Sequence, residues 1–220
     1  MDMTKWMAAY EAAMLEAFGD RVRYIGLQGS RGRGEAGPDS DIDVVLILDE
    51  LTPADLVTYR AAAAALPERD KLCGFVSGAA ELAAWDPGEL FQFRRDTTDR
   101  YGRLSDLLPP EEPGDAHRAL HTAACGIYHL CCHNGLHGRD LAAAEGACKG
   151  AVFALQAKAY LETGTYHRRH RDLGKALTGA DLAVFRAAEA VRQGEHPLDL
   201  DALTALLLEW SGDLIRRRED

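Results

Sequence analysis

A short stretch between two apolar segments combines residue types that can bind a phosphate chain. It reads GSRGRGEAGPDSDID and begins at Gly29. A Gly-Ser pair after a strand lets backbone N–H groups approach an anion closely, because glycine has no side chain to block the approach. The Ser30 hydroxyl is a further donor, and Arg31 and Arg33 add positive charge. These residues together indicate an anion site.

The same stretch ends with two carboxylates at alternate positions. Asp41 and Asp43 begin the apolar run VVLIL, which is typical of a buried strand. Residues two apart on a strand project from the same face. Two carboxylates on one face repel each other unless a cation lies between them, and oxygen ligands favour Mg²⁺. The whole stretch therefore predicts a site for a metal-bound nucleoside triphosphate.

Each half of this pattern is weak alone, because Gly-Ser pairs and DxD triplets are common at strand ends. The complete order of strand, Gly-Ser, Ser-Asp-Ile-Asp and strand is more specific. Over about residues 22–49, it resembles the signature of polymerase-β-like nucleotidyltransferases. Small bacterial members carry Gly-Ser-x-Ala-Arg-Gly followed by Ser-Asp-x-Asp. Here Gly32 takes the usual alanine position and Arg33 follows in register.

The resemblance implies a reaction and roles for particular residues. Gly29, Ser30 and Arg33 would bind the triphosphate of ATP or another nucleoside triphosphate. Asp41 and Asp43 would hold one or two Mg²⁺ ions and form part of the catalytic site. A nucleoside monophosphate would pass to an acceptor, with pyrophosphate as the leaving group.

The family pattern includes a third acid on a later strand, and the matching segment KLCGFVSG contains none. Asp70 precedes this segment, and Asp96 follows the next predicted strand. Asp96 is the preferred substitute because it ends an apolar strand in our interpretation. Activating an acceptor hydroxyl usually requires a base, so a catalytically inactive nucleotide-binding module stays an alternative.

The apolar periodicity predicts two domains. The expected strands are Val22–Leu27, Ile42–Leu48, Lys71–Val76 and Glu89–Arg94, with helices over 4–18, 52–66 and 79–85. The segment LLPPEEPGDA then marks a boundary, and long helices are expected over 115–135, 140–164, 180–193 and 199–216. The predicted fold class is α+β: a mixed-sheet nucleotidyltransferase domain (1–108), a linker (109–116) and an all-α helical bundle (117–220).

The helical half offers further candidates for nucleotide binding. Its segment KGAVFALQAKAYLETGTY is similar to the helical domain of aminoglycoside adenylyltransferases and to HEPN-like bundles. Lys149, Gln156 and Tyr160 share one helix face. Lys149 could contact the triphosphate and Tyr160 the base or acceptor, with the active site expected between the two halves. A solvated lysine and a half-buried tyrosine are the alternative. The Arg and His spacing of HEPN ribonucleases is absent.

Two clusters of basic or metal-ligating residues have ordinary explanations. The first recurs every four residues: His117, His121, Cys125, His129, His133 and His137. A packed or lining helix face is favoured over zinc, because this spacing drifts around a helix and the HExxH pattern is absent. The second cluster, YHRRHR, is interpreted as a solvated helix start.

Composition narrows the partners. The net charge of −10 disfavours broad contact with nucleic acid and suits a small cationic acceptor. No apolar run approaches the ~20 residues of a membrane span, and the five cysteines lack disulfide-framework spacing. We therefore expect a cytoplasmic enzyme whose acceptor is a hydroxyl of a small molecule, with an aminoglycoside-like antibiotic as first candidate. A protein side chain is the alternative acceptor, and the oligomeric state is not predicted.

Overall fold

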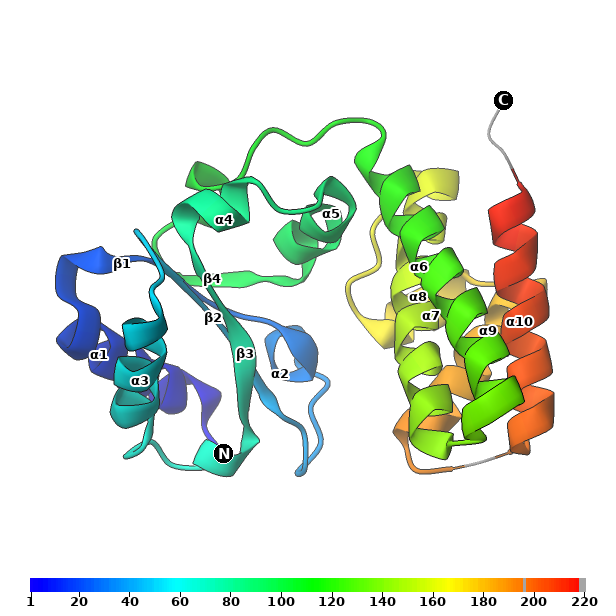
Figure 1. Ribbon diagram of the computed structural model, residues 1–220, viewed down its shortest axis with the longest axis horizontal. Coiled ribbons are helices and arrows are strands. Elements are labelled where there is room, and N and C mark those ends of the chain that lie inside the picture. Colours follow the sequence, from blue (N-terminus) through cyan, green and yellow to red (C-terminus); the bar gives the residue numbers. More distant parts are fainter. Residues whose placement is uncertain (196, 218–220) are drawn as a thin grey trace. The chain divides into compact units, whose positions relative to one another are not determined.

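Figure 1 shows the computed structural model, which describes residues 1–195 and 197–217. The chain divides into two compact units. The first, the sheet unit, comprises Met1–Asp86 and Phe93–Pro110, and the second, the helical unit, comprises Pro87–Gln92 and Glu111–Asp220. The predicted α+β class, with a mixed sheet followed by a helical bundle, is confirmed. The inclusion of Pro87–Gln92 in the helical unit was not expected from the sequence.

The sheet has four strands in the order β3-β2-β1-β4. Strand β1 pairs antiparallel with both β2 and β4, whereas β2 pairs parallel with β3, so the sheet is mixed. The strands are β1 (Val22–Leu27), β2 (Ile42–Leu48), β3 (Leu72–Gly78) and β4 (Thr98–Tyr101). The predicted bounds of the first two strands are confirmed. Every residue of β2 except Asp43 is buried, as its continuous apolar run predicts.

Helices α1 (Met3–Phe18) and α3 (Pro53–Ala63) cover one face of this sheet (Figure 1). The sheet unit also contains two short helices, α2 (Gly29–Arg33) and α4 (Ala79–Ala83). Met7, Tyr10 and Met14 lie on one side of α1, are fully buried, and pack on the sheet with alternate residues of β1 and β2. The core is thus assembled directly behind the strands that carry the Gly29–Asp43 stretch.

A charged network ties the start of β1 to α3. The Arg21 guanidinium donates two hydrogen bonds to Asp55, of 2.7 and 3.0 Å. Thr52, the N-cap residue of α3, donates its backbone N–H and its hydroxyl to the same carboxylate, at 2.7 and 2.8 Å. The Arg21 hydrogen bonds, followed by those from Thr52, hold the pKa of Asp55 well below its usual range. This network fixes the entry of β1 into the sheet.

One predicted strand is wrong. The segment Glu89–Arg94 belongs to helix α5 (Pro87–Asp96), because proline and an acidic residue in the first turn start a helix more strongly than two alternating phenylalanines start a strand. The strand that does follow, β4, reads TDRY and is exposed throughout. Its polar sequence lacks the apolar alternation by which a strand is recognised. The short helix α2 was likewise expected to be only a turn.

The helical unit consists of long helices packed side by side (Figure 1). It contains α6 (Asp115–His133), a π-helical turn (Asn134–Gly138), α7 (Leu141–Thr163), α8 (His170–Ala176), α9 (Gly179–Arg192) and α10 (Leu200–Arg216). The four long helices predicted here are confirmed to within a few residues at their ends. Its core is rich in alanine along α7, which lets neighbouring helices approach closely. Across the described ranges, no helix is long and apolar enough to span a membrane.

Candidate active site

Gly29 lies directly against the carboxylate of Asp43. A Cβ atom at position 29 would stand only 1.8 Å from Asp43 Oδ2 and 2.7 Å from its Cγ. The backbone at Gly29 also has a φ of 64°, a region that residues with a side chain rarely adopt. The contact with Asp43 and the positive φ therefore each require glycine at position 29. Only glycine allows the start of α2 to lie this close to the start of β2.

The backbone fixes this approach. The N–H of Gln28 donates to the carbonyl of Asp43 at 2.7 Å, which joins the end of β1 to the start of β2. The side-chain amide of Gln28 donates to Thr97 Oγ1 at 2.6 Å, just before β4. Three neighbouring segments of the sheet therefore hold Gly29 in place against Asp43.

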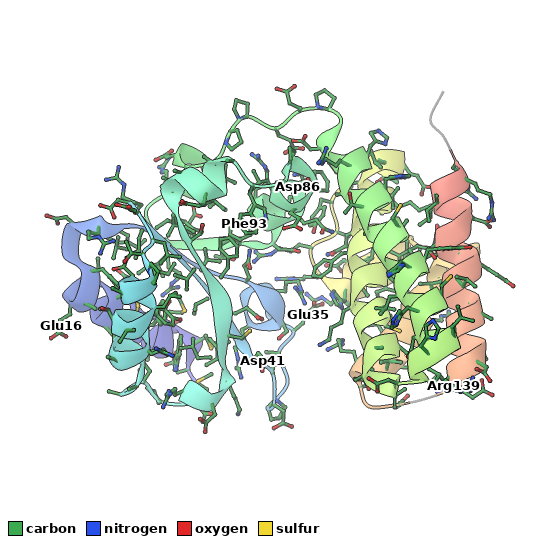
Figure 2. All side chains as sticks on the ribbon, viewed as in Figure 1. Glu16, Glu35, Asp41, Asp86, Phe93 and Arg139 are labelled. Atoms are coloured by element: carbon green, nitrogen blue, oxygen red, sulfur yellow. The ribbon has the colours of Figure 1, made fainter. Side chains whose placement is uncertain are left out.

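Arg31 has a positioning role in this structure. Its guanidinium donates to the carbonyl of Ser40 at 2.6 Å through Nη2 and to the carbonyl of Asp41 at 2.9 Å through Nε. The loop that leads into β2, where Figure 2 labels Asp41, is thereby held by the helix at the other end of the motif. The sequence gives no signal for this role, because the acceptors are backbone carbonyls nine and ten residues away.

Arg33 and Ser30 lie on the same short helix. Arg33 Nε is 3.4 Å from Glu35 Oε2, and both side chains are largely buried. Ser30 is half-buried, and its carbonyl accepts the N–H of Glu35 at 2.8 Å. The first N–H groups of a helix have no acceptor within it, so the start of α2 presents donors beside Asp43. The nucleotide-binding roles of Ser30 and Arg33 stay predictions.

The sequence predicts that Asp96 ends a strand, and this prediction is wrong. Asp96 is the last residue of α5 and is buried, with 6% of its surface exposed. The structural reason for preferring it as the third acid is therefore lost, and its catalytic role stays an untested prediction.

The predicted face of α7 combines three different environments. Lys149 is exposed, Gln156 is fully buried and Tyr160 is half-buried. The Gln156 amide donates to the carbonyls of His167 and Arg168, at 3.0 and 3.3 Å, so it anchors the segment before α8. Tyr160 packs edge-on against Phe91, with ring centroids 5.1 Å apart. The ligand roles of Lys149 and Tyr160 are not tested by these contacts.

The four-residue repeat of α6 is not a packed face. Its members from His121 to His137 are exposed, whereas α6 packs through a different side that includes Ala119, Ala124 and Ile127. Within the repeat, Cys125 Sγ lies 3.6 Å from His121 Nε2. Among the residues that the structure describes, no three His, Cys, Asp or Glu side chains converge on a metal position.

The carboxylate pair suits a hard cation in the type of its ligand atoms. Mg²⁺ is commonly held by one or two carboxylates together with substrate phosphates. Asp41 and Asp43 supply that number, and glycine at position 29 lets the backbone at the start of α2 lie against Asp43. A third protein ligand does not converge with them within the described part of the chain.

Comparison with protein families agrees with this geometry. A family model described as "Nucleotidyltransferase domain" matches residues 11–85, which include the second half of α1, the Gly29–Asp43 stretch and β3. This region therefore resembles a nucleotidyltransferase domain, in agreement with the resemblance of its Gly29–Asp43 stretch to polymerase-β-like nucleotidyltransferases. The match contains the Gly29–Asp43 contact, and no curated protein matches the sequence.

A solved structure resembles both the nucleotidyltransferase domain and the helical unit. It is the crystal structure of spectinomycin adenyltransferase AAD(9) from Enterococcus faecialis with ATP and spectinomycin. The TM-score is 0.65, the sequence identity is 12%, and the alignment covers 97% of this chain and 99% of that chain. The similarity therefore concerns the fold along nearly the whole length.

Proposed function

We propose that the chain is a Mg²⁺-dependent nucleotidyltransferase that moves a nucleoside monophosphate, AMP from ATP, to a hydroxyl of a small molecule. The observation that carries this proposal is the contact between Gly29 and the Asp43 carboxylate. Glycine lets the Asp43 carboxylate lie against the backbone at the start of α2, so the backbone N–H groups that would bind phosphate and the carboxylate that would bind Mg²⁺ are neighbours, whereas any other residue would push them apart.

The proposed roles follow from the positions of the side chains. Asp41 and Asp43 would hold Mg²⁺, which when bound to a triphosphate offsets charge on the phosphate oxygens. The start of α2, with Gly29 and Ser30, would bind the phosphates. Arg31 keeps Asp41 in place through the loop carbonyls.

The acceptor is proposed to be an aminoglycoside-like antibiotic. The solved structure of similar fold carries spectinomycin together with ATP. The net charge of −10 on this chain would attract a cationic acceptor. Lys149 is proposed to meet the triphosphate and Tyr160 the base or acceptor.

The experiment is calorimetry with each of the four ribonucleoside triphosphates, with and without Mg²⁺. We expect metal-dependent binding of ATP to the wild type and its loss in Asp41→Asn, because the amide cannot supply the charge that Mg²⁺ requires. Asp20→Asn, which alters an exposed carboxylate outside the motif, is the matched control and should bind normally. Equal binding by the wild type and Asp41→Asn would refute the assignment.

A second candidate is a nucleotide-binding module without transfer activity. It is favoured by one observation, the lack of a third converging ligand among the described residues. Pyrophosphate release with ATP and spectinomycin would separate the two functions. Release above the acceptor-free rate supports transfer, and tight ATP binding without release to any aminoglycoside-like acceptor supports the binding module.

A further inference from the structure

Part of the four-residue repeat on α6 brings two metal-ligating side chains together. Cys125 Sγ lies 3.6 Å from His121 Nε2, and both residues are exposed. Residues four apart are neighbours on the surface of a helix, so the backbone of α6 keeps the two side chains on one side. Packing does not account for them, because α6 enters the core of the helical unit through other residues, among them Ala124 and Ile127. The pair therefore needs a different explanation.

The distance between the two atoms is the one that a shared zinc ion would impose. Zinc binds thiolate sulfur at about 2.3 Å and imidazole nitrogen at about 2.0–2.1 Å, and it prefers tetrahedral geometry. Two such bonds at a tetrahedral angle leave the sulfur and the nitrogen about 3.6 Å apart. Cys125 Sγ and His121 Nε2 are therefore already spaced as two corners of a zinc tetrahedron.

Both groups also have the right chemistry for such an ion. Thiolate and neutral imidazole are usual zinc ligands, whereas Mg²⁺ and Ca²⁺ prefer oxygen. On binding, the S–H bond of Cys125 breaks and its proton passes to solvent, an S–Zn bond forms, and His121 donates the lone pair of Nε2. Within the described ranges no third His, Cys, Asp or Glu converges with this pair, so water would complete the coordination.

We infer that His121 and Cys125 form a two-ligand binding site for Zn²⁺ and chemically similar ions, such as Co²⁺ and Cd²⁺, on the exposed side of α6. The site lies within the helical unit and involves neither Asp41 nor Asp43, so it is independent of the proposed function. A metal ion held by residues four apart closes one turn of α6, and its binding therefore stabilises the folded helix.

The test is titration with Co²⁺, whose thiolate complexes absorb strongly in the near ultraviolet. We expect the wild type to show this charge-transfer band, Zn²⁺ to remove it by displacement, and Cys125→Ser to lack it. His121→Gln should bind Co²⁺ at least about tenfold more weakly, because a second ligand on the same helix acts at a high effective concentration. His133→Gln, which alters another exposed histidine of α6, is the matched control and should bind as the wild type does.

A second readout counts protons. Calorimetry with Zn²⁺ in two buffers that differ in ionisation enthalpy measures how many protons the protein releases. The wild type should release about one proton for each ion bound at this site, because the thiol loses its proton on binding. Cys125→Ser should release none. A cation attracted only by surface carboxylates would displace no thiol proton, so this readout separates the site from non-specific attraction.

Three results would overturn the inference. A band of equal intensity in Cys125→Ser would place the metal at another cysteine. Equal affinity of the wild type and His121→Gln would show that the thiol binds alone, and a wild type without the band would show that neither residue binds the metal. Asp41→Asn should keep the band while it loses metal-dependent ATP binding, so the failure of either proposal leaves the other unaffected.

Discussion

Two carboxylates, Asp43 in the sheet unit and Asp181 in the helical unit, have very different neighbours. In the sheet unit, the group pressed against Asp43 is a glycine. In the helical unit, Asp181 forms an ion pair with the ammonium group of Lys158 and accepts a hydrogen bond from the indole N–H of Trp210 at 2.7 Å. Glycine allows the Asp43 carboxylate to lie against the backbone at the start of α2, whereas Asp181 links helices through a lysine and an indole.

The lysine in this contrast is itself held by two acids. Lys158 Nζ also contacts Glu162 Oε1 at 2.6 Å. Burial by itself would lower the pKa of Lys158, but its hydrogen bonds to Asp181 and Glu162 raise it. Lys158 is therefore charged in the folded helical unit. The contrast therefore predicts that a substitution beside Asp43 will change ligand binding and that a substitution beside Asp181 will change stability.

The largest effect is expected for Gly29→Ala. The new methyl group would displace the Asp43 carboxylate, and the positive φ would add strain. We expect metal-dependent ATP binding to fall at least about 100-fold, because small displacements of a ligand group cost that much. Calorimetry measures the loss, and circular dichroism checks the fold.

Gly34→Ala is the matched control for this prediction. Gly34 also has a positive φ, of 71°, but nothing lies within 4 Å of the position its Cβ would take. It should carry the backbone strain alone, of about 1 kcal/mol, and retain ATP binding. Equal losses in the two variants would show that strain, and not the approach to Asp43, explains the need for glycine.

The next effect tests the helical unit. Lys158→Ala leaves the largely buried Asp181 without its cation and also removes the partner of Glu162, whose side chain is 55% exposed. We expect the free energy of unfolding to fall by about 2–3 kcal/mol, somewhat less than for a fully buried pair. Urea unfolding followed by circular dichroism measures it.

Lys175→Ala provides the comparison within the same unit. The Lys175 side chain is 77% exposed, and its Nζ lies 3.4 Å from Asp172. Exposed pairs contribute less than about 1 kcal/mol, so this variant should unfold almost as the wild type does. A similar loss in both lysine variants would remove the distinction between the buried and exposed pairs.

The sequence predicted the sheet unit well where a single apolar period dominates. The strands β1 and β2 and the long helix α1 follow from such periods. The segment of α5 was misassigned because Phe91 and Phe93 mimic strand alternation, while the helix-starting proline outweighs them. The periodicity of apolar residues thus identified helices and strands correctly, except in α5, where phenylalanine alternation and a helix-starting proline indicate different structures.

The candidate site was only partly predictable. The spacing in GSRGRGEAGPDSDID identified the residue types, and the family comparison supports the domain that contains them. The hydrogen bonds of Arg31 and the pairing of Asp43 with Cys73 depend on how distant segments meet. Strand order and parallel register are set by tertiary packing, so a single sequence does not reveal them.

The smallest expected effect concerns pH and the carboxylate of Glu189, on α9. Burial alone would raise its pKa, but hydrogen bonds from His170, at 2.7 Å, and from Arg192 lower it to about 2. Because the pKa of Glu189 is lowered, its charged form stabilises the folded state at pH values above 4.5, the ordinary pKa of a glutamate. This contribution is lost as the pH falls from 4.5 toward 2. The expected loss is roughly 2 kcal/mol, reduced for partial exposure.

Comparison with Glu189→Gln isolates this contribution from those of other acids. The glutamine variant should be less stable than the wild type at pH 7, and the difference between the two free energies of unfolding should shrink steadily below pH 4.5, because the protonated glutamate is then as neutral as the amide. Urea unfolding at successive pH values measures that difference. If the difference in free energy of unfolding stays constant from pH 7 to pH 3, shape and hydrogen bonding, rather than charge, hold α8 to α9. Glu189 would then differ from Asp181, whose charge is neutralised by a cation.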